Sequence, residues 1–174
     1  MSTLYVDSIQ PKTTGSIINA KGMVIQVVSI VKSDTFSTAN QSFTDIPNLT
    51  ASITPTSTNS KILIMSTING SQNVGANRSN LRLLRGSEAI FVGDTASNRL
   101  QGTAGFSSAH ADLINTVHTS FVDSPSSTAE VTYKWQCIVN AGSGSVYINR
   151  SVNDNDATNQ LRWASNITLM EIGG

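Results

Sequence analysis

The stretch VTYKWQCIV, residues 131–139, alternates apolar and polar side chains more clearly than any other part of this 174-residue chain. Its apolar members at alternate positions are Val131, Tyr133, Trp135, Cys137 and Val139. Because successive side chains of a β-strand point to opposite faces, this spacing places all five on one face. The stretch therefore predicts a strand with one buried face, on which Trp135 is a core residue that contacts no ligand.

Comparable stretches lie along the rest of the chain, separated by residues that favour turns. We expect strands at residues 23–32, 49–54, 61–68, 81–84, 89–92, 113–122, 145–149 and 161–172. Residues 23–32 are apolar almost throughout, which predicts a strand that is buried on both faces. Residues 81–84 and 89–92 flank Arg85-Gly86-Ser87-Glu88, which predicts a hairpin with a four-residue connection.

No part of the chain repeats its apolar residues with the period of a helix. About eight to ten strands around one core predict an all-β fold, and a jelly-roll-like β-sandwich of two sheets is the architecture that suits this number. The polar, turn-rich residues 69–80 and 93–111 are then expected to form loops at one end of the sandwich.

The first 22 residues differ from the rest of the chain. Residues 4–9 and 17–18 favour short strands, and residues 11–15 between them favour a turn. A segment this short cannot bury a core of its own. We interpret residues 1–22 as a short extended N-terminal arm for attachment, and residues 23–174 as the β-sandwich head domain. A frayed terminus, or an edge strand folded onto its own domain, is the alternative interpretation of the arm.

The charge composition argues against a nucleic-acid-binding protein. Lys plus Arg and Asp plus Glu each number 11, so the formal net charge is zero, whereas phosphate binding needs a surplus of cations on one face. A nearly neutral surface favours association, which indicates that neighbours in an assembly cover part of it. No apolar run is long enough for a membrane span, and the N-terminus lacks the layout of a signal peptide. We therefore expect no membrane insertion and synthesis in a cytoplasm.

The titratable residues do not form a recognisable metal site. His110 and His118 would be about 26 Å apart along a strand, so they cannot share a metal within one chain, although either could meet its own copies around a three-fold axis. The segment Asn153-Asp154-Asn155-Asp156 offers oxygen ligands, but it lacks the glycine and the distal glutamate of a calcium-binding EF-hand loop. We expect a solvated loop there.

The sequence also lacks the groups of an enzyme. Cys137 stands on the aromatic face of a strand with no base nearby in the sequence, so we expect it to pack in the core. Asp154 and Asp156 lie on the same loop, whereas the two carboxylates of a glycosidase normally face each other across a cleft. No nucleophile elbow, phosphate-binding glycine loop or zinc half-site is present. The sequence therefore predicts a protein without catalytic activity, metal or cofactor.

Several phrases of the chain resemble small fibre proteins of marine and cyanobacterial tailed bacteriophages. They are LYVDSI (4–9), GMVIQVV (22–28), FTDI (43–46), SITP (52–55), VYINRS (146–151) and SNITLMEI (165–172). The similarity spans nearly the whole chain apart from the loops, and none of these phrases contains a catalytic residue. The resemblance implies a trimer of jelly rolls, similar in outline to the C1q and tumour-necrosis-factor heads, on the virion.

From this resemblance and the arm we expect a bacteriophage virion structural protein, the protomer of a homotrimeric tail fibre or appendage that aids attachment to the host surface. The arm would contact other tail or capsid proteins through Leu4, Tyr5, Val6 and Ile9. Exposed aromatic and amide groups on end loops would bind a host glycan, with candidates Asn73, Asn77, Arg78, Asn98, Arg99 and Asn155. The alternatives are a head-fibre, decoration or adaptor protein without a receptor, and a lectin-like enzyme or polysaccharide depolymerase.

Overall fold

The structure is a computed structural model that describes residues 21–73, 79–107, 110–140 and 144–174. These residues contain strands and turns but no helix, which confirms the all-β prediction. The strands are β1 (Val24–Lys32), β2 (Phe36–Thr38), β3 (Thr44–Ile53), β4 (Lys61–Gln72), β5 (Ser79–Arg85), β6 (Glu88–Ile90), β7 (Asn115–Asp123), β8 (Val131–Val139), β9 (Val146–Ile148) and β10 (Ser165–Ile172).

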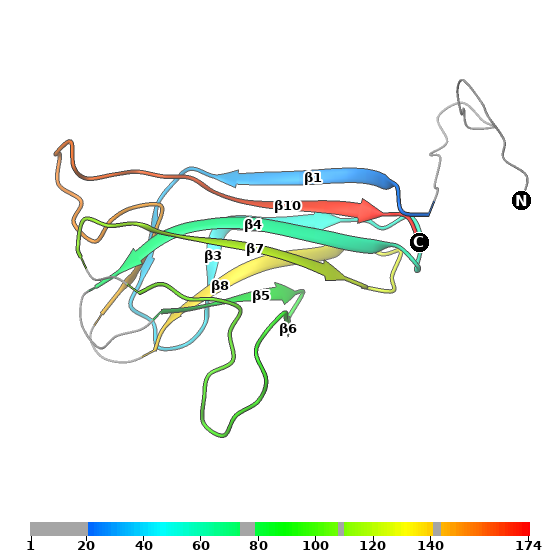
Figure 1. Cartoon of the computed structure of the whole chain (residues 1–174), viewed down its shortest axis with the longest axis horizontal. Coiled ribbons are helices and arrows are strands. Elements are labelled where there is room, and N and C mark those ends of the chain that lie inside the picture. The colour runs from blue at the N-terminus through cyan, green and yellow to red at the C-terminus, as the bar shows by residue number, and fades with distance from the viewer. Residues whose placement is uncertain (1–20, 74–78, 108–109, 141–143) are drawn as a thin grey trace, which may run out of the picture.

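The strands form two antiparallel sheets. The second sheet has the order β3-β8-β5-β6. The first sheet contains β1, β10, β4 and β7, which Figure 1 shows one above another, and the short strands β2 and β9 extend it. Gly70 of β4 pairs with β7 on one side and β9 on the other, so β9 lies on the same side of β4 as β10. The strands β9 and β10 are thus two halves of one interrupted strand, and β2 continues β1 in the same way.

This strand order is that of a jelly roll. Apart from the two interrupted strands and the hairpin between β5 and β6, every connection passes from one sheet to the other. Such alternation between two sheets, with β1 and β10 as neighbours although they stand at opposite ends of the domain sequence, is the double Greek-key arrangement. The predicted jelly-roll-like β-sandwich is therefore confirmed.

The core lies between the two sheets, and β8 contributes its largest side chains. Tyr133 and Trp135 are completely buried, as the alternation of residues 131–139 predicts. The indole nitrogen of Trp135 donates a hydrogen bond of 3.0 Å to Ser66 Oγ on β4, so its one polar atom has a partner in the opposite sheet. The prediction that Trp135 belongs to the core is confirmed.

One carboxylate also connects the two sheets. Asp123, at the end of β7, accepts hydrogen bonds from Tyr133 Oη at 2.7 Å and from Arg85 Nη1 at 3.0 Å. Burial and the neighbouring carboxylate raise the pKa of Tyr133, so its hydroxyl remains a donor. This buried pairing is possible because each polar group has a partner.

Several details differ from the sequence predictions. Strand β1 is not buried on both faces, because Val24, Val27 and Val31 are 53%, 53% and 65% exposed. It is an edge strand, and none of the described strands covers its outward face. The hairpin connection is also shorter than predicted, since Arg85 and Glu88 pair and only Gly86 and Ser87 lie between them. Gly86 has a φ of +59°, the left-handed conformation that a first hairpin residue of this kind requires.

Another difference concerns residues 69–80, predicted as a loop. Strand β4 continues to Gln72 and β5 begins at Ser79, so the connection is only residues 73–78. The polar residues Asn69, Ser71 and Gln72 look like turn residues in the sequence, but all three are buried in the sheet. Residues 93–111 contain no strand where the structure describes them, in agreement with the prediction.

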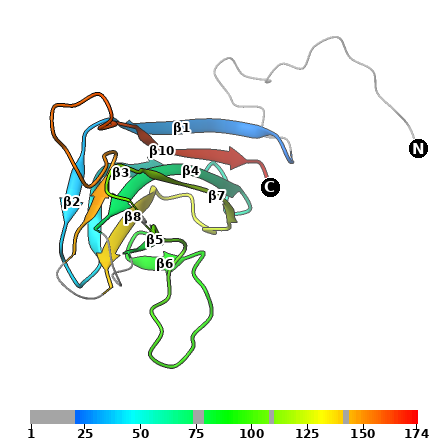
Figure 2. The same cartoon turned by 60° about the vertical axis from the view of Figure 1, so that its left-hand side comes forward.

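The described part of the chain begins beside its C-terminus. Gly22 N donates to Gly173 O at 2.8 Å, and Gly173 N donates to Met23 O at 2.9 Å. The segment 149–164, which interrupts β9 and β10, lies at the opposite end of the sandwich in both Figure 1 and Figure 2. Residues 1–20, which include Leu4, Tyr5, Val6 and Ile9 of the predicted arm, lie outside the described residues.

Candidate functional site

The segment of residues 149–164, here called the distal loop, leaves the first sheet and returns to it at nearly the same point. Asn149 lies where the chain leaves the sheet and fixes its path there. It has a φ of 63°, a left-handed conformation that asparagine tolerates, and its Nδ2 donates to the carbonyls of Lys32 and Asp34 at 2.8 and 2.9 Å. Its Oδ1 accepts from Ser165 Oγ at 2.6 Å where the chain returns. One buried side chain thus holds both ends of the distal loop.

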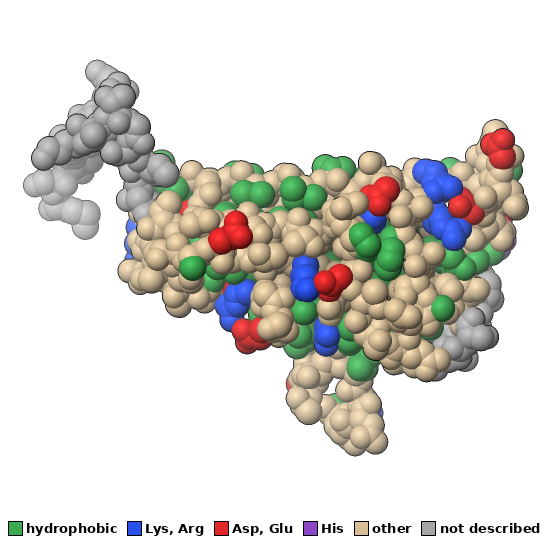
Figure 3. All heavy atoms as spheres, turned by 180° about the vertical axis from the view of Figure 1, so that it is seen from behind, with side chains coloured by type: hydrophobic (Ala, Val, Ile, Leu, Met, Phe, Trp, Pro, Cys, Tyr) green, Lys and Arg blue, Asp and Glu red, His purple; other side chains and the backbone are tan. Residues whose placement is uncertain are grey.

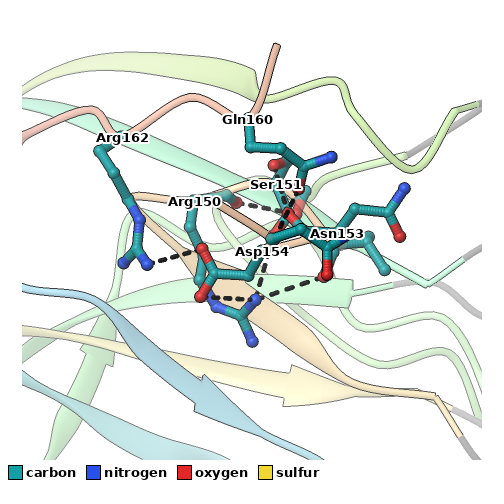
Figure 4. A network of polar contacts seen from close by, with 9 residues as sticks. Arg150, Ser151, Asn153, Asp154, Gln160 and Arg162 are labelled. Atoms are coloured by element: carbon teal, nitrogen blue, oxygen red, sulfur yellow. Dashed lines mark hydrogen bonds and ion pairs between the residues drawn. The ribbon is translucent and has the colours of Figure 1, made fainter. Parts of the chain in front are cut away.

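A carboxylate between two arginines shapes the loop itself (Figure 4). Asp154 lies 2.6 Å from Arg162 Nη2 and 3.4 Å from Arg150 Nη1. Arg150 also stacks its guanidinium 4.2 Å above the ring of Tyr147. Because both oxygens of Asp154 face a guanidinium, this carboxylate is already neutralised by protein groups.

The distal loop is also fixed to the residues that precede β7. Asp112 Oδ1 accepts from Asn153 Nδ2 at 2.8 Å and from Gln160 Nε2 at 3.0 Å. Asn153 N donates to Ala111 O at 3.1 Å. These contacts hold the loop in one shape, with its outer rim open to solvent.

Asn155 lies on that outer rim, as predicted for an exposed loop residue. It borders a shallow hollow of about 310 Å³ with Asp154, Asp156, Ala157, Gln160 and Arg162. The hollow offers amide, carboxylate and guanidinium groups, which can hydrogen-bond hydroxyl groups of a ligand. Nowhere in the described parts of the chain do three His, Cys, Asp or Glu side chains gather in a way that could hold a metal.

Trp163 is an exposed aromatic residue that the sequence analysis did not single out. It is 38% exposed, and its backbone N donates to Asn149 O at 3.1 Å. The predicted strand at 161–172 would put Trp163 on the same inward face as Ile167 and Leu169. The strand begins only at Ser165, so the alternation does not extend to Trp163, and the sequence contains no signal of this change.

A second loop, residues 91–107, projects from the sandwich beside β6 (Figure 2). Gly93 N donates to Gly102 O at 3.2 Å and Gln101 Nε2 donates to Gly93 O at 2.6 Å, which closes its base. A Cβ at Gly102 would collide with the amide of Asn80, so a larger residue there would require the Asn80 side chain to move. Asn98 and Arg99 border the hollow of about 710 Å³ at this loop, together with Asn80, Gln101, Asn140 and nine further residues.

The four predicted glycan-binding residues that the structure describes do not converge on one site. Asn98 and Arg99 lie together on the projecting loop, whereas Asn155 lies on the distal loop. Asn73 is half-buried, and its Oδ1 accepts from Ser145 N at 3.1 Å, so it serves to close the end of the first sheet. Asn77 and Arg78 lie outside the described residues.

The remaining candidates for chemistry have structural surroundings. Cys137 is buried, and burial raises the pKa of its thiol to about 12, so it is not a nucleophile at neutral pH. His118 lies on the exposed face of β7, 3.0 Å from Thr67 Oγ1. His110 precedes β7 and its Nδ1 accepts from Asp112 N at 3.2 Å.

Charged groups are scattered on the face that Figure 3 shows. Several charged groups of the domain are paired. Lys134 lies 2.7 Å from Asp45, and Arg85 lies 2.7 Å from Glu88. This face carries no continuous cationic patch of the kind that binds nucleic acid. The described residues also contain no helix that could cross a membrane.

No protein-family model matches this chain, and no curated protein matches it. Among solved structures it is similar to the VP2 subviral particle of infectious bursal disease virus, with 12% identity and a TM-score of 0.44 over 97% of this chain and 42% of that chain. The T=1 particles derived from infectious bursal virus give 10% identity and a TM-score of 0.45, over 97% and 41% of the two chains. The structure of the Gx strain of infectious bursal disease virus gives 13% identity and a TM-score of 0.42, over 98% of this chain and 41% of that chain.

The chain thus spans less than half the length of the solved chains that it matches. The jelly roll follows from the strand order of the molecule itself. By its fold and its exposed loops, the protein is a single β-sandwich of jelly-roll type, with a buried core and polar loops that project from it.

Proposed function

We propose that this protein is a structural component of a tailed-bacteriophage virion, the protomer of a homotrimeric tail fibre or appendage that aids attachment to the host surface. The observation that carries the proposal is which parts of the chain lie at the two ends of the domain. The chain enters at Gly22 beside the C-terminus, and the distal loop lies at the opposite end (Figure 1). An arm at residues 1–22 that joins other tail or capsid proteins would leave the distal loop pointing away from the particle.

A non-enzymatic role fits the chemistry of the described residues. Asp154 is paired with two arginines and Cys137 is buried, so neither is available as a base or a nucleophile. The hollows on the two loops are lined by amide, hydroxyl and charged side chains without a convergent pair of catalytic groups. We therefore propose a protein that binds without catalysis and needs no cofactor.

Host attachment would use the two exposed loops. Asn98 and Arg99 on the projecting loop and Asn155 on the distal loop can donate to sugar hydroxyls, and Trp163 adds an aromatic ring at the distal end. A host-surface glycan is the ligand class that such amide, guanidinium and indole groups fit. Protein is then made in the host cytoplasm and incorporated into the particle.

Two measurements test this function. Gold-labelled antibody against the protein should label the tail of the intact particle in electron micrographs, and the absence of label on the particle would refute a virion location. Adsorption of particles to host cells should fall at least tenfold for Trp163→Ala or for Asn98→Ala/Arg99→Ala. The matched control is Thr50→Ala on the outward face of β3, which should adsorb like the wild type.

A purely structural role, as a head-fibre, decoration or adaptor protein, is the second candidate. The observation that favours it is that no aromatic side chain lines either loop hollow, whereas sugar sites commonly stack an aromatic ring on the ligand. Labelling of the head, unchanged adsorption of the loop variants and no binding to a glycan array would establish this candidate instead.

A further inference from the structure

The outward face of the first sheet carries an apolar row that none of the residues described by the structure covers. Val27 pairs with Met170, Met170 with Leu63, and Leu63 with Val122, so the four side chains stand in register across β1, β10, β4 and β7. The two ends of the row are about half exposed, with Val27 at 53% and Val122 at 47%. Figure 1 shows these four strands one above another.

The equivalent row of the second sheet is different. It consists of Thr50, Lys134, Leu84 and Ala89, in register across β3, β8, β5 and β6. Its large apolar member, Leu84, is only 3% exposed. The second sheet thus leaves no row of apolar side chains in water, whereas the first sheet does. Contiguous apolar surface of this kind marks an interaction site in soluble proteins.

The charge of the face indicates what covers it. On the outward positions of β1, β10, β4 and β7, Lys61 is the only residue with a permanent charge, and His118 is the only other titratable one. A face without a strong field does not repel an identical copy, and it has no charge with which to select a charged partner. Beside the row lies a shallow hollow of about 340 Å³, lined by Met65, Thr67, His118, Ser120 and three further residues of the same strands, with buried Ser66 beneath. This hollow offers a neighbour's side chains a place to enter.

The size of the face also fits a second copy. Four strands about 4.8 Å apart and eight residues of about 3.3 Å each give a footprint of about 500 Å². A stable interface takes about 800 Å² from each partner, so this face supplies the larger part of one.

We propose that the outward face of the first sheet is the surface by which copies of this chain associate, with the row Val27, Met170, Leu63 and Val122 at its centre. This inference rests on the proposed homotrimer and names the surface that buries its apolar side chains. In a closed three-fold arrangement each copy's face is covered by the next copy, and no apolar row remains in water.

The test compares two double variants of the full-length chain. Val27→Glu/Val122→Glu places a charge at both ends of the apolar row, and Thr50→Glu/Ala89→Glu does the same to the matched row of the second sheet. By size-exclusion chromatography with light scattering at 20 µM, roughly the concentration range in which stable interfaces persist, wild type and the control pair should have three times the 18.5 kDa chain mass. The first variant should have the chain mass, with an unchanged far-UV circular dichroism spectrum.

A second measurement avoids dependence on folding of a charged variant. Cys137 is the only cysteine and is buried, so Ser120→Cys on the first sheet and Thr50→Cys on the second sheet can each be labelled with a maleimide alone. The inference expects Thr50→Cys to react at least tenfold faster than Ser120→Cys. If the wild type is a trimer but the two cysteines are labelled at equal rates, the proposed contact surface is wrong and the proposed trimer stands. The same conclusion follows if the Val27→Glu/Val122→Glu variant is still a trimer. A monomeric wild type overturns both.

Discussion

The carboxylates of Asp123 and Asp154 each bind an arginine, but they lie in regions of opposite character. Asp123 lies between the two sheets with its side chain 8% exposed, whereas Asp154 lies on the distal loop with its side chain 34% exposed. Between the sheets, only protein groups can satisfy a carboxylate, and Tyr133 and Arg85 do so. On the distal loop, water can replace either partner of Asp154.

The difference teaches that the same pairing has two different consequences. In the core, loss of the carboxylate leaves buried donors without an acceptor, and this lowers the free energy of unfolding. On the loop, loss of the carboxylate changes the shape of the rim while solvent hydrates the arginines. We expect the core to determine whether the domain folds, and the loops to determine what it binds.

The largest effect should come from the core tryptophan. Trp135→Ala removes a completely buried indole and should lower the free energy of unfolding by about 3 to 5 kcal/mol, through lost transfer energy and the cavity that remains. Thermal and urea unfolding followed by circular dichroism measure it. The matched control is Trp163→Ala, which should cost less than about 1 kcal/mol because that ring is partly in water. Equal losses for the two variants would contradict the comparison of core and loop.

The next effect should come from the two carboxylates themselves. Asp123→Ala removes the acceptor of Tyr133 and of Arg85 and should cost about 2 to 3 kcal/mol, because a charge-assisted pairing is lost inside the protein. Glu88→Ala removes the other, exposed partner of Arg85, and Asp154→Ala removes the loop carboxylate. Both should change the stability by less than about 1 kcal/mol. The comparison fails if Asp154→Ala destabilises the domain as much as Asp123→Ala.

The smallest expected effect is a loss of stability at acid pH that depends on Glu171, a buried carboxylate at the end of β10. Burial alone would raise its pKa, but hydrogen bonds from Gln26 and Thr56 outweigh burial and lower it below the ordinary value of 4.5. A lowered folded-state pKa stabilises the protein above the ordinary value, and this contribution is lost as the pH falls through the folded-state pKa.

The melting temperature of the wild type should therefore fall more steeply below pH 4.5 than that of Glu171→Gln, whose amide does not titrate. Differential scanning calorimetry between about pH 3 and pH 7 measures both slopes. Asp34 and Asp45 also have lowered pKa values but are largely exposed, and they titrate in both proteins. Identical slopes for the two proteins would show that Glu171 does not contribute.

Much of the fold could be predicted because most strands keep one face in the core. The alternation at residues 131–139 and 49–54 matches the buried positions of β8 and β3. The strand at 161–172 was predicted too long, because Trp163 continues the alternation although the chain has left the sheet there. The apolar residues of β1 gave no sign of their exposure, since a sequence pattern does not tell which strand lies at an edge.

The candidate site was only partly predictable for the same kind of reason. Asn98, Arg99 and Asn155 were expected on exposed loops, and they are exposed there. Asn73 has the same composition signal, but it hydrogen-bonds the backbone of Ser145, a residue 72 positions away in the sequence. Trp163 was missed because its exposure depends on where Asn149 and Ser165 close the distal loop.

The sequence by itself determined the all-β class, the inward face of the central strand and the turns between strands. These features depend on the local periodicity of apolar residues and on the backbone conformations that Gly, Pro and Asn favour. Both are properties of residues that are close together in the sequence. Tertiary structure alone decided that β9 and β10 form one interrupted strand, that Asp123 and Asp154 have different surroundings, and that the first sheet keeps an apolar row in water. Each of these depends on contacts between residues far apart in the chain, and local sequence carries no record of which distant strand will lie alongside.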